Sequence, residues 1–152
     1  MASHNIEQLY RDVIMDHYKN PHNKGLLKLE GYKPVHLNNP SCGDDMNVEV
    51  KIDGDTIVDV RHDGHGCSIC CSSASVMSET IKGKTIAEAN KLINGFYDMI
   101  QTNEIDDEME EALGEAIAYT GVAQFPARIK CATLSWKAIE KAINEDGDSN
   151  AK

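Results

Sequence analysis

Apolar residues near the N-terminus recur at the spacing of one helical face. They stand at Ile6, Leu9, Tyr10, Val13 and Ile14, with mostly polar residues between them. An Asn-Pro pair at positions 20 and 21 is typical of the end of a helix, because the residue before a proline avoids helical backbone angles. The pattern therefore predicts an amphipathic helix over residues 5–18.

A second pattern, with a period of two residues, predicts a β-hairpin. Apolar and polar residues alternate around Val50 and Ile52, and after a Gly-Asp turn the apolar pattern resumes around Val58 and Val60. Because one face of such a hairpin is buried, the apolar residues of the two strands should face each other. Matching them pairs Val50 with Val60 and Ile52 with Val58.

The rest of the chain predicts a loop and a series of helices. Residues 22–41 are rich in Asn, Pro and Gly, and they predict a loop with one short strand near residues 35–37. Beyond the hairpin, helical periodicity predicts helices over residues 68–82, 85–93, 107–119 and 126–143, separated by Gly83, Gly95 and Gly121. We expect an α+β fold in a single domain over residues 1–143, followed by a disordered polar tail over residues 144–152.

Composition narrows the classes of function. The net charge of −10 disfavours binding to nucleic acid or anionic lipid, since both require basic surfaces. No apolar stretch approaches the ~20 residues of a membrane span, and the N-terminus does not resemble a secretory signal, so we expect a cytoplasmic protein. In a reducing cytoplasm the five cysteines indicate metal binding or thiol chemistry rather than disulfides.

The hairpin register predicts where two of these cysteines meet. Extending the Val50–Val60 pairing outward brings Cys42 level with Ser68, next to Cys67, across a strand spacing of ~5 Å. Asp44 is two residues from Cys42 and points to the same side of an extended chain, and the glycine between them permits a tight bend. Local geometry thus predicts three candidate metal ligands.

A fourth candidate, Cys131, lies early in the last predicted helix, near Arg128 and Lys130. The helix dipole and these cations would favour its thiolate, and Arg128 is suited to stabilise an anionic site. Three thiolates and a carboxylate suit tetrahedral zinc, whereas iron–sulfur ligation and simple burial of apolar cysteines are the competing interpretations. The spacing alone leaves these alternatives open.

Two further interpretations concern residues close to Cys67. The Cys67-x-x-Cys70 spacing would suit a zinc knuckle, yet no second pair accompanies it, and Cys70 and Cys71 are more simply explained as small apolar residues. His65 is a possible ligand that simple exposure explains equally well. The acidic run over residues 106–111 is the solvated first turn of a helix or a docking surface for a basic partner.

Three stretches resemble the cysteine motifs of a known family. They are Asn39-Pro-Ser-Cys-Gly-Asp44, Gly64-His-Gly-Cys-Ser-Ile69 and Arg128-Ile-Lys-Cys-Ala-Thr-Leu134. With their order and spacing, they make nearly the whole chain similar to the iron–sulfur scaffold family that includes IscU and SufU. The resemblance implies a three-stranded antiparallel sheet packed by about five helices. It also implies one metal site, with ligands Cys42, Asp44, Cys67 and Cys131.

Within this family the chain is more similar to the SufU type. The scaffold type carries a histidine before the third cysteine, where this chain has Lys130, so a potential cluster ligand is missing. In the scaffold type a dedicated chaperone binds a Leu-Pro-Pro-Val-Lys segment. The corresponding segment here is different, Phe125-Pro-Ala-Arg-Ile129. The 63 residues between Cys67 and Cys131 include an acidic stretch, residues 104–111, that resembles the SufU insertion. All three departures favour a zinc-bearing sulfur acceptor.

The resemblance implies a zinc-dependent sulfurtransferase that takes persulfide sulfur from a SufS-like cysteine desulfurase and supplies downstream iron–sulfur assembly proteins. An iron–sulfur cluster scaffold and a binding module with structural zinc are the alternatives. We expect Cys42 to be the acceptor thiol, because it lies on a glycine-flanked loop, whereas Cys67 and Cys131 lie at helix starts. Arg128 would assist by balancing the negative charge of the site.

Overall fold

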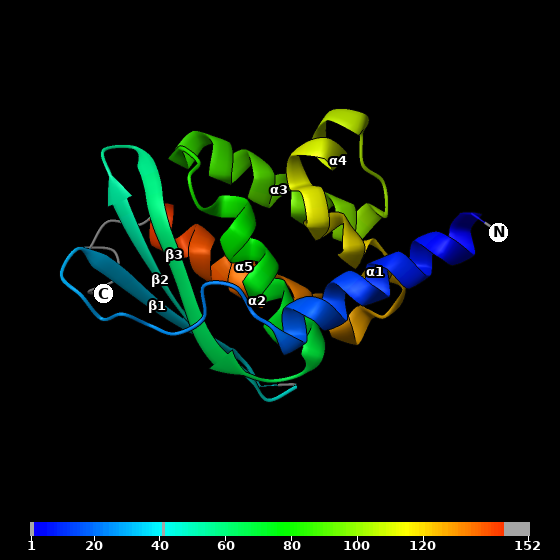
Figure 1. The fold of residues 1–152 in the computed structure, drawn as a ribbon, viewed down its shortest axis with the longest axis horizontal. Helices are drawn as coiled ribbons and strands as arrows, with labels where there is room; N and C mark the ends of the chain where they lie inside the picture. The colour runs from blue at the N-terminus through cyan, green and yellow to red at the C-terminus, as the bar shows by residue number, and fades with distance from the viewer. Residues whose placement is uncertain (1, 41, 145–152) are drawn as a thin grey trace.

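A three-stranded antiparallel sheet forms one side of the molecule and helices cover it (Figure 1). The computed structural model describes residues 2–40 and 42–144. The elements are α1 (Ala2–Lys19), β1 (Tyr32–Asn39), β2 (Asp44–Asp53), β3 (Thr56–His65), α2 (Ser68–Ile81), α3 (Ile86–Thr102), α4 (Asp107–Leu113), the 3-10 helix η1 (Gly114–Gln124) and α5 (Pro126–Asn144). The predicted α+β class is confirmed. The predicted tail lies, from residue 145 onward, outside the described residues.

The hairpin of β2 and β3 has the predicted register over most of its length. Val50 pairs with Val60 as expected, but the expected pair of Ile52 and Val58 is wrong, because the register shifts after Lys51 and Ile52 pairs with Ile57. Ile57 is held there by the segment that follows α2: its backbone accepts from Gly83 and donates to Lys84. Ile57 is consequently buried and Val58 exposed.

The edge strand β1 is longer than its sequence predicts. It pairs with β2 along all eight of its residues, from Tyr32 opposite Lys51 to Asn39 opposite Asp44. Pro34 is tolerated because β1 has a neighbour on one side, so a missing donor can face away from the ladder. Pairing with β2 thus overrides a loop-like composition.

Helices α2 and α5 pack on the sheet, α1, α3 and η1 pack on these two helices, and α4 packs on α3 and η1 (Figure 1). The apolar residues of α5 from Leu134 to Ile143 are buried, and Trp136 of the same helix stacks on Phe96 of α3 with ring centroids 4.0 Å apart. A capping box of Thr85 and Glu88 begins α3. This core fixes α5 against the end of the sheet that carries the first two cysteine motifs.

Two predicted helix bounds are wrong because glycine acts differently at two positions. Gly95 was expected to separate helices, but it lies inside α3, where a Cβ would stand 2.4 Å from the Met109 sulfur of α4. Its bare backbone allows the two helices to meet. Gly114 instead ends α4 with a positive φ of 56°, so the predicted helix 107–119 divides into α4 and η1.

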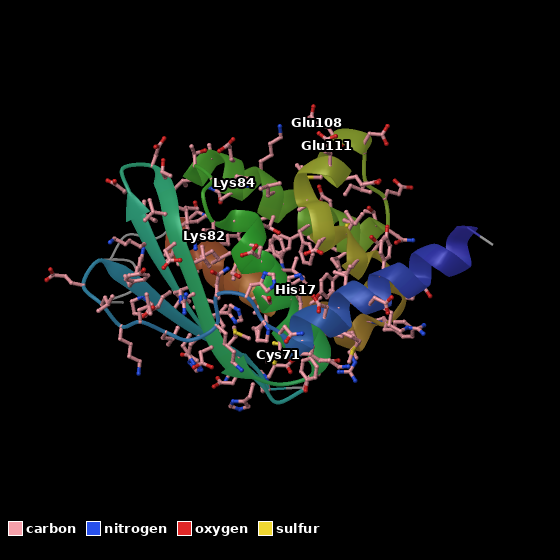
Figure 2. All side chains as sticks on the ribbon, viewed as in Figure 1. His17, Cys71, Lys82, Lys84, Glu108 and Glu111 are labelled. Atoms are coloured by element: carbon pink, nitrogen blue, oxygen red, sulfur yellow. The ribbon has the colours of Figure 1, made fainter. Side chains whose placement is uncertain are left out.

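The side chain of His17 joins three helices beneath the surface (Figure 2). Its Nδ1 lies 2.7 Å from Ser75 Oγ on α2, and its Nε2 lies 2.8 Å from a carboxylate oxygen of Glu115 on η1. His17 is buried. We expect His17→Ala to lower the free energy of unfolding by about 2–4 kcal/mol, because it leaves a cavity and removes both bonds. Thermal melts will measure this, with Lys19→Ala, an exposed position of the same helix, as the near-neutral control.

Candidate metal centre

Cys42 lies on the tight connection between β1 and β2. The backbone N–H groups of Cys42 and Gly43 both donate to the carbonyl of Asn39, at 3.1 and 2.9 Å, and close a turn. Gly43 has φ of +73°, a conformation that glycine adopts without strain. The turn places the thiol of Cys42 at the surface, where it is exposed. Cys42 is therefore the cysteine of this cluster that another protein can reach most easily.

Asp44 is the first residue of β2 and is buried. One carboxylate oxygen accepts the backbone N–H of Cys67 at 3.0 Å, which links the β1–β2 turn to the start of α2. Gly66 makes this approach possible, since a Cβ there would stand 2.2 Å from the same carboxylate oxygen. The second oxygen lies 3.5 Å from the amide nitrogen of Asn39.

Cys67 caps the N-terminus of α2. Its extended backbone turns the side chain toward the first turn of the helix, where Sγ accepts the backbone N–H of Cys70 at 3.4 Å. The positive end of the helix favours negative charge on such a capping sulfur. Cys67 was expected to lie close to the Cys42 loop. It does so because it caps the start of α2, directly after β3.

Cys131 brings the third motif to this point from the second turn of α5. Single ligand atoms of Cys42, Asp44 and Cys131 all lie within 4.8 Å of one another. Cys67 is outside this tightest group, but it joins it through hydrogen bonds to Cys131 and Asp44. The structure therefore brings all four of the residues expected as ligands to one end of the sheet.

Two groups that support this cluster were missed in the sequence. The buried side chain of Asn39 points its amide at both Asp44 and Cys131, lying 3.9 Å from the sulfur of the latter. The carbonyl of Ala127 lies 3.8 Å from the sulfurs of both Cys42 and Cys131. Asn39 opens the first cysteine motif, so its place in that motif was the signal that could have found it.

The protonation of the thiols depends on how crowded the cluster is. Burial raises the pKa of Cys131, and its hydrogen bonds with Asp44, Cys42 and Cys67, in which the neutral thiol donates, raise the pKa further. Burial is also the main cause of the raised pKa of Cys70 and Cys71. Without a cation Cys131 therefore favours the neutral thiol, and a divalent metal would hold it as a thiolate. A donor set of three thiols and one carboxylate fits zinc in this respect.

Arg128 and Lys130 both project from the exposed start of α5. The hydrogen bond that Arg128 makes with Cys131, together with the nearby thiols, raises the pKa of its guanidinium. Arg128 thus contacts the cluster, as a residue that balances negative charge would. Lys130 occupies the position at which the scaffold type carries histidine. Among the described residues, it makes no contact with the cysteine cluster like that of Arg128.

The remaining cysteines have different surroundings. Cys70 is fully buried in the core, as an apolar residue would be. Cys71 is half-buried one position later, with its sulfur 3.9 Å from the carbonyl of Gly66 (Figure 2). It lines a pocket of about 230 Å³ that also includes His65. His65 is exposed and lies outside the tight cluster, which agrees with its interpretation as a solvated side chain.

Comparison with known proteins agrees with this arrangement. Residues 9–148 match the family described as NifU-like N terminal domain. The chain belongs to this family. The NifU-like domain is 50% identical over 146 residues to the zinc-dependent sulfurtransferase SufU of Bacillus subtilis, covering 96% of this chain and 97% of that protein.

The NifU-like domain is also similar to an iron–sulfur scaffold protein and to a NifU-like protein of known structure. It is 42% identical over 149 residues to the iron–sulfur cluster assembly scaffold protein IscU of Streptococcus pyogenes, covering 98% of this chain and 91% of that one. The crystal structure of a nitrogen-fixing NifU-like protein from Brucella abortus superposes with a TM-score of 0.77 at 21% identity. It covers 91% of this chain and 94% of that one, so it shows the shared fold. In the described part of the NifU-like domain, no helix has the length and apolar character needed to cross a membrane.

Proposed function

We propose that this chain is a cytoplasmic zinc-dependent sulfurtransferase that accepts persulfide sulfur from a cysteine desulfurase for iron–sulfur cluster assembly. The observation that carries the proposal is the convergence of three thiols and a carboxylate with only Cys42 exposed among the three thiols. The SufU relative of Bacillus subtilis, whose name states a zinc-dependent sulfurtransferase, supports it.

The ligands of the zinc are Cys42, Asp44, Cys67 and Cys131 in this proposal. Zinc bound by these residues would hold the thiols as thiolates at neutral pH. Four negative ligands exceed the charge of the ion by two, and the guanidinium of Arg128 offsets part of this excess beside Cys131. Asn39 donates to Asp44 and Cys131, so it orients two ligands without contacting the metal.

Cys42 is the acceptor in this proposal because the other two thiols are held more firmly. Cys67 is fixed as a helix cap, and Cys131 is buried on α5. The Cys42 thiolate attacks the terminal sulfur of the partner's persulfide, the S–S bond of the partner breaks, and the partner's cysteine leaves as a thiolate. A histidine of the partner is suited to occupy the ligand position that Cys42 leaves.

A pocket beside the cluster offers a surface for that partner. It has a volume of about 380 Å³ and is lined by α1, η1 and the start of α5, with Tyr10, Ile14 and Phe125 among its walls. Phe125 is 62% exposed, which is unusual for a large aromatic residue and typical of a contact site. Arg128 lines the pocket and also touches the cluster, so a desulfurase bound here would reach Cys42.

The test is the variant Cys42→Ala. We expect it to retain substantial zinc, since three ligands remain, but to lose all stimulation of the desulfurase. Zinc content per chain and sulfide release by the desulfurase measure the two properties, and Cys71→Ser serves as the matched control with both intact. Mass spectrometry after incubation with desulfurase and cysteine should place the added sulfur on the Cys42 peptide. Full stimulation by Cys42→Ala would refute the assignment.

The scaffold alternative has its own observation, which is the similarity to the Streptococcus pyogenes IscU. It predicts a brown, oxygen-sensitive preparation containing iron and sulfide. Our proposal predicts a colourless protein with one tightly bound zinc. Lys130 favours the second outcome, because an exposed ammonium replaces the histidine that the scaffold type carries beside its third cysteine.

Gly66 is expected to control the affinity of the site for zinc. A Cβ at this position would collide with the Asp44 carboxylate, so Gly66→Ala should displace that ligand and break its bond to the Cys67 backbone. We expect zinc affinity to fall about 10–100-fold, as for the loss of groups that orient metal ligands. Competition with a zinc chelator measures this. Gly43→Ala, where a Cβ meets no atom within 4 Å, separates backbone strain from the collision with Asp44.

A further inference from the structure

Cys70 stands directly behind a proposed zinc ligand without being one. Cys67 occupies the N-cap of α2, and Cys70 is the third residue of that helix. Its backbone N–H donates to the Cys67 sulfur at 3.4 Å. Cys70 is fully buried, and its side chain packs in the core. The proposed function uses Cys67 and gives no role to the thiol of Cys70.

The geometry of the helix start suits a bond between these two sulfurs. Cys67 has an extended backbone, with φ of −73° and ψ of 167°, so its side chain lies over the first turn rather than away from it. An N-cap residue and the residue three positions later are close enough for the ~4.4–6.8 Å Cα separation of disulfides. A Cys-x-x-Cys pair at a helix N-terminus is also where thiolates are stabilised and redox pairs occur.

We propose that Cys67 and Cys70 form a redox switch that releases zinc when a peroxide oxidises the site. The proposal rests on the proposed function, because it takes Cys67 to be a zinc ligand. In the first step, the Cys67 thiolate attacks one oxygen of hydrogen peroxide, the O–O bond breaks and hydroxide leaves, giving a sulfenic acid. In the second, the Cys70 thiol attacks the Cys67 sulfur, its proton joins the departing hydroxide, and a disulfide and water form.

Cys70 is the resolving thiol because it lies one helical turn from Cys67 and is not a ligand in the proposed zinc site. The sulfur of Cys71 lies 3.9 Å from the carbonyl of Gly66. Cys131 hydrogen-bonds to Cys67, but the proposed function holds both Cys131 and Cys42 as zinc ligands. Both sulfurs also lie 3.8 Å from the carbonyl of Ala127. Burial protects Cys70 from direct attack by peroxide, so it remains a thiol until Cys67 has been oxidised.

The disulfide would switch off the site reversibly. A sulfur bound in a disulfide is no longer a thiolate ligand. Cys67 also holds the Asp44 carboxylate through its backbone N–H, so the disulfide removes one thiolate and disturbs a second ligand, and the ion leaves. Loss of the exposed Cys42 leaves that contact in place. Reduction by a dithiol restores Cys67. Without Cys70, peroxide would carry Cys67 on to the sulfinic and sulfonic acids, which a dithiol does not reduce. The pair therefore protects the ligand while it inactivates the protein.

The experiment treats zinc-loaded full-length protein with hydrogen peroxide. Zinc release is followed with a chelating dye, and peptides are mapped by mass spectrometry without reduction after free thiols have been alkylated. We expect loss of one zinc per chain, loss of two hydrogens from the peptide that carries Cys67 and Cys70, and an alkylated Cys71. Dithiothreitol with added zinc should then restore full zinc content.

The test variant is Cys70→Ala and the matched control is Cys71→Ser. Peroxide should still release zinc from Cys70→Ala, but Cys67 should end as sulfinic or sulfonic acid, and dithiothreitol should fail to restore zinc. Cys71→Ser should behave as the wild type. A disulfide that joins another pair, such as Cys42 with Cys67, or equal recovery of Cys70→Ala and wild type, would overturn the proposal.

The proposed function and the switch can fail separately. If the wild type binds no zinc, the proposed function fails, and the peptide map of the metal-free protein still decides whether Cys67 and Cys70 join. If Cys70→Ala does not fold, as judged by circular dichroism, the disulfide map of the wild type decides alone. Normal zinc content with no disulfide after peroxide treatment would overturn the switch and leave the proposed function intact.

Discussion

Removal of zinc is expected to lower the melting temperature by about 10 °C. An ion that binds only the native chain stabilises it by RT ln(1 + [L]/Kd), which is about 4 kcal/mol at a thousandfold excess over Kd. A domain of this size melts about 2–4 °C lower for each kcal/mol lost. The site joins the β1–β2 turn, the start of α2 and α5, so the loss is expected to loosen these elements first. Calorimetry with and without a chelator measures the shift.

Cys131→Ser is the variant that tests whether the change in melting temperature comes from the metal. It removes the ligand on which the hydrogen bonds of Asp44, Cys42 and Cys67 converge, so zinc and chelator should change its melting temperature much less than that of the wild type. Cys71→Ser should keep the full shift, because its sulfur faces the carbonyl of Gly66 instead of the cluster. If the chelator does not change the melting temperature of the wild type, zinc does not contribute to the stability of the fold.

Zinc affinity is expected to rise steeply with pH, by up to about 10³ per unit below the thiol pKa values. Each of three thiols must lose a proton to become a ligand, and each proton released contributes about tenfold per pH unit. Burial raises the pKa of Cys131, which extends this rise through neutral pH. Competition titrations with a chelator of known pH dependence, from pH 6 to 8, measure the slope.

The metal-free protein should respond to pH with the opposite sign. A thiol whose pKa is higher in the folded chain stabilises that chain fully below the unfolded pKa near ~8.5, and loses this contribution as the pH rises beyond it. Alkaline solution should therefore weaken the apo form and strengthen zinc binding. Denaturant unfolding of chelator-treated protein at pH 7 and pH 10 measures the stability of the metal-free form. The free energy of unfolding should be lower at pH 10.

Two substitutions distinguish the contribution of a thiol from that of a carboxylate to the pH dependence of zinc affinity. Cys131→Ser should reduce the slope by about one proton per zinc. Asp44→Asn should lower the affinity yet leave the slope unchanged, because a carboxylate is already ionised above pH 6. Equal slopes for wild type and Cys131→Ser would contradict thiolate ligation by Cys131.

The alternation of apolar residues was sufficient to place most of the hairpin, because a one-residue slip would expose its buried face. It could not predict the shift after Lys51, since that depends on the backbone of Gly83 and Lys84 pairing with Ile57. Likewise, Gly95 has the signature of a helix end, and only the packing of Met109 explains why it lies inside α3. Local patterns failed where a distant segment supplied the deciding contact.

The sequence by itself determined the chemistry of the candidate site. Thiols, a carboxylate and a glycine-flanked turn stand in recognisable motifs, and the hairpin register brings two of those motifs to one end of the sheet. Tertiary structure decided what the motifs cannot encode locally. The packing of α5 on the sheet brings Cys131 to Asp44 and points Asn39 at both, while burial leaves Cys42 as the exposed thiol of the cluster. Residue types set which bonds are possible, and packing sets which of them form, because ligands far apart in the chain meet only in the folded core.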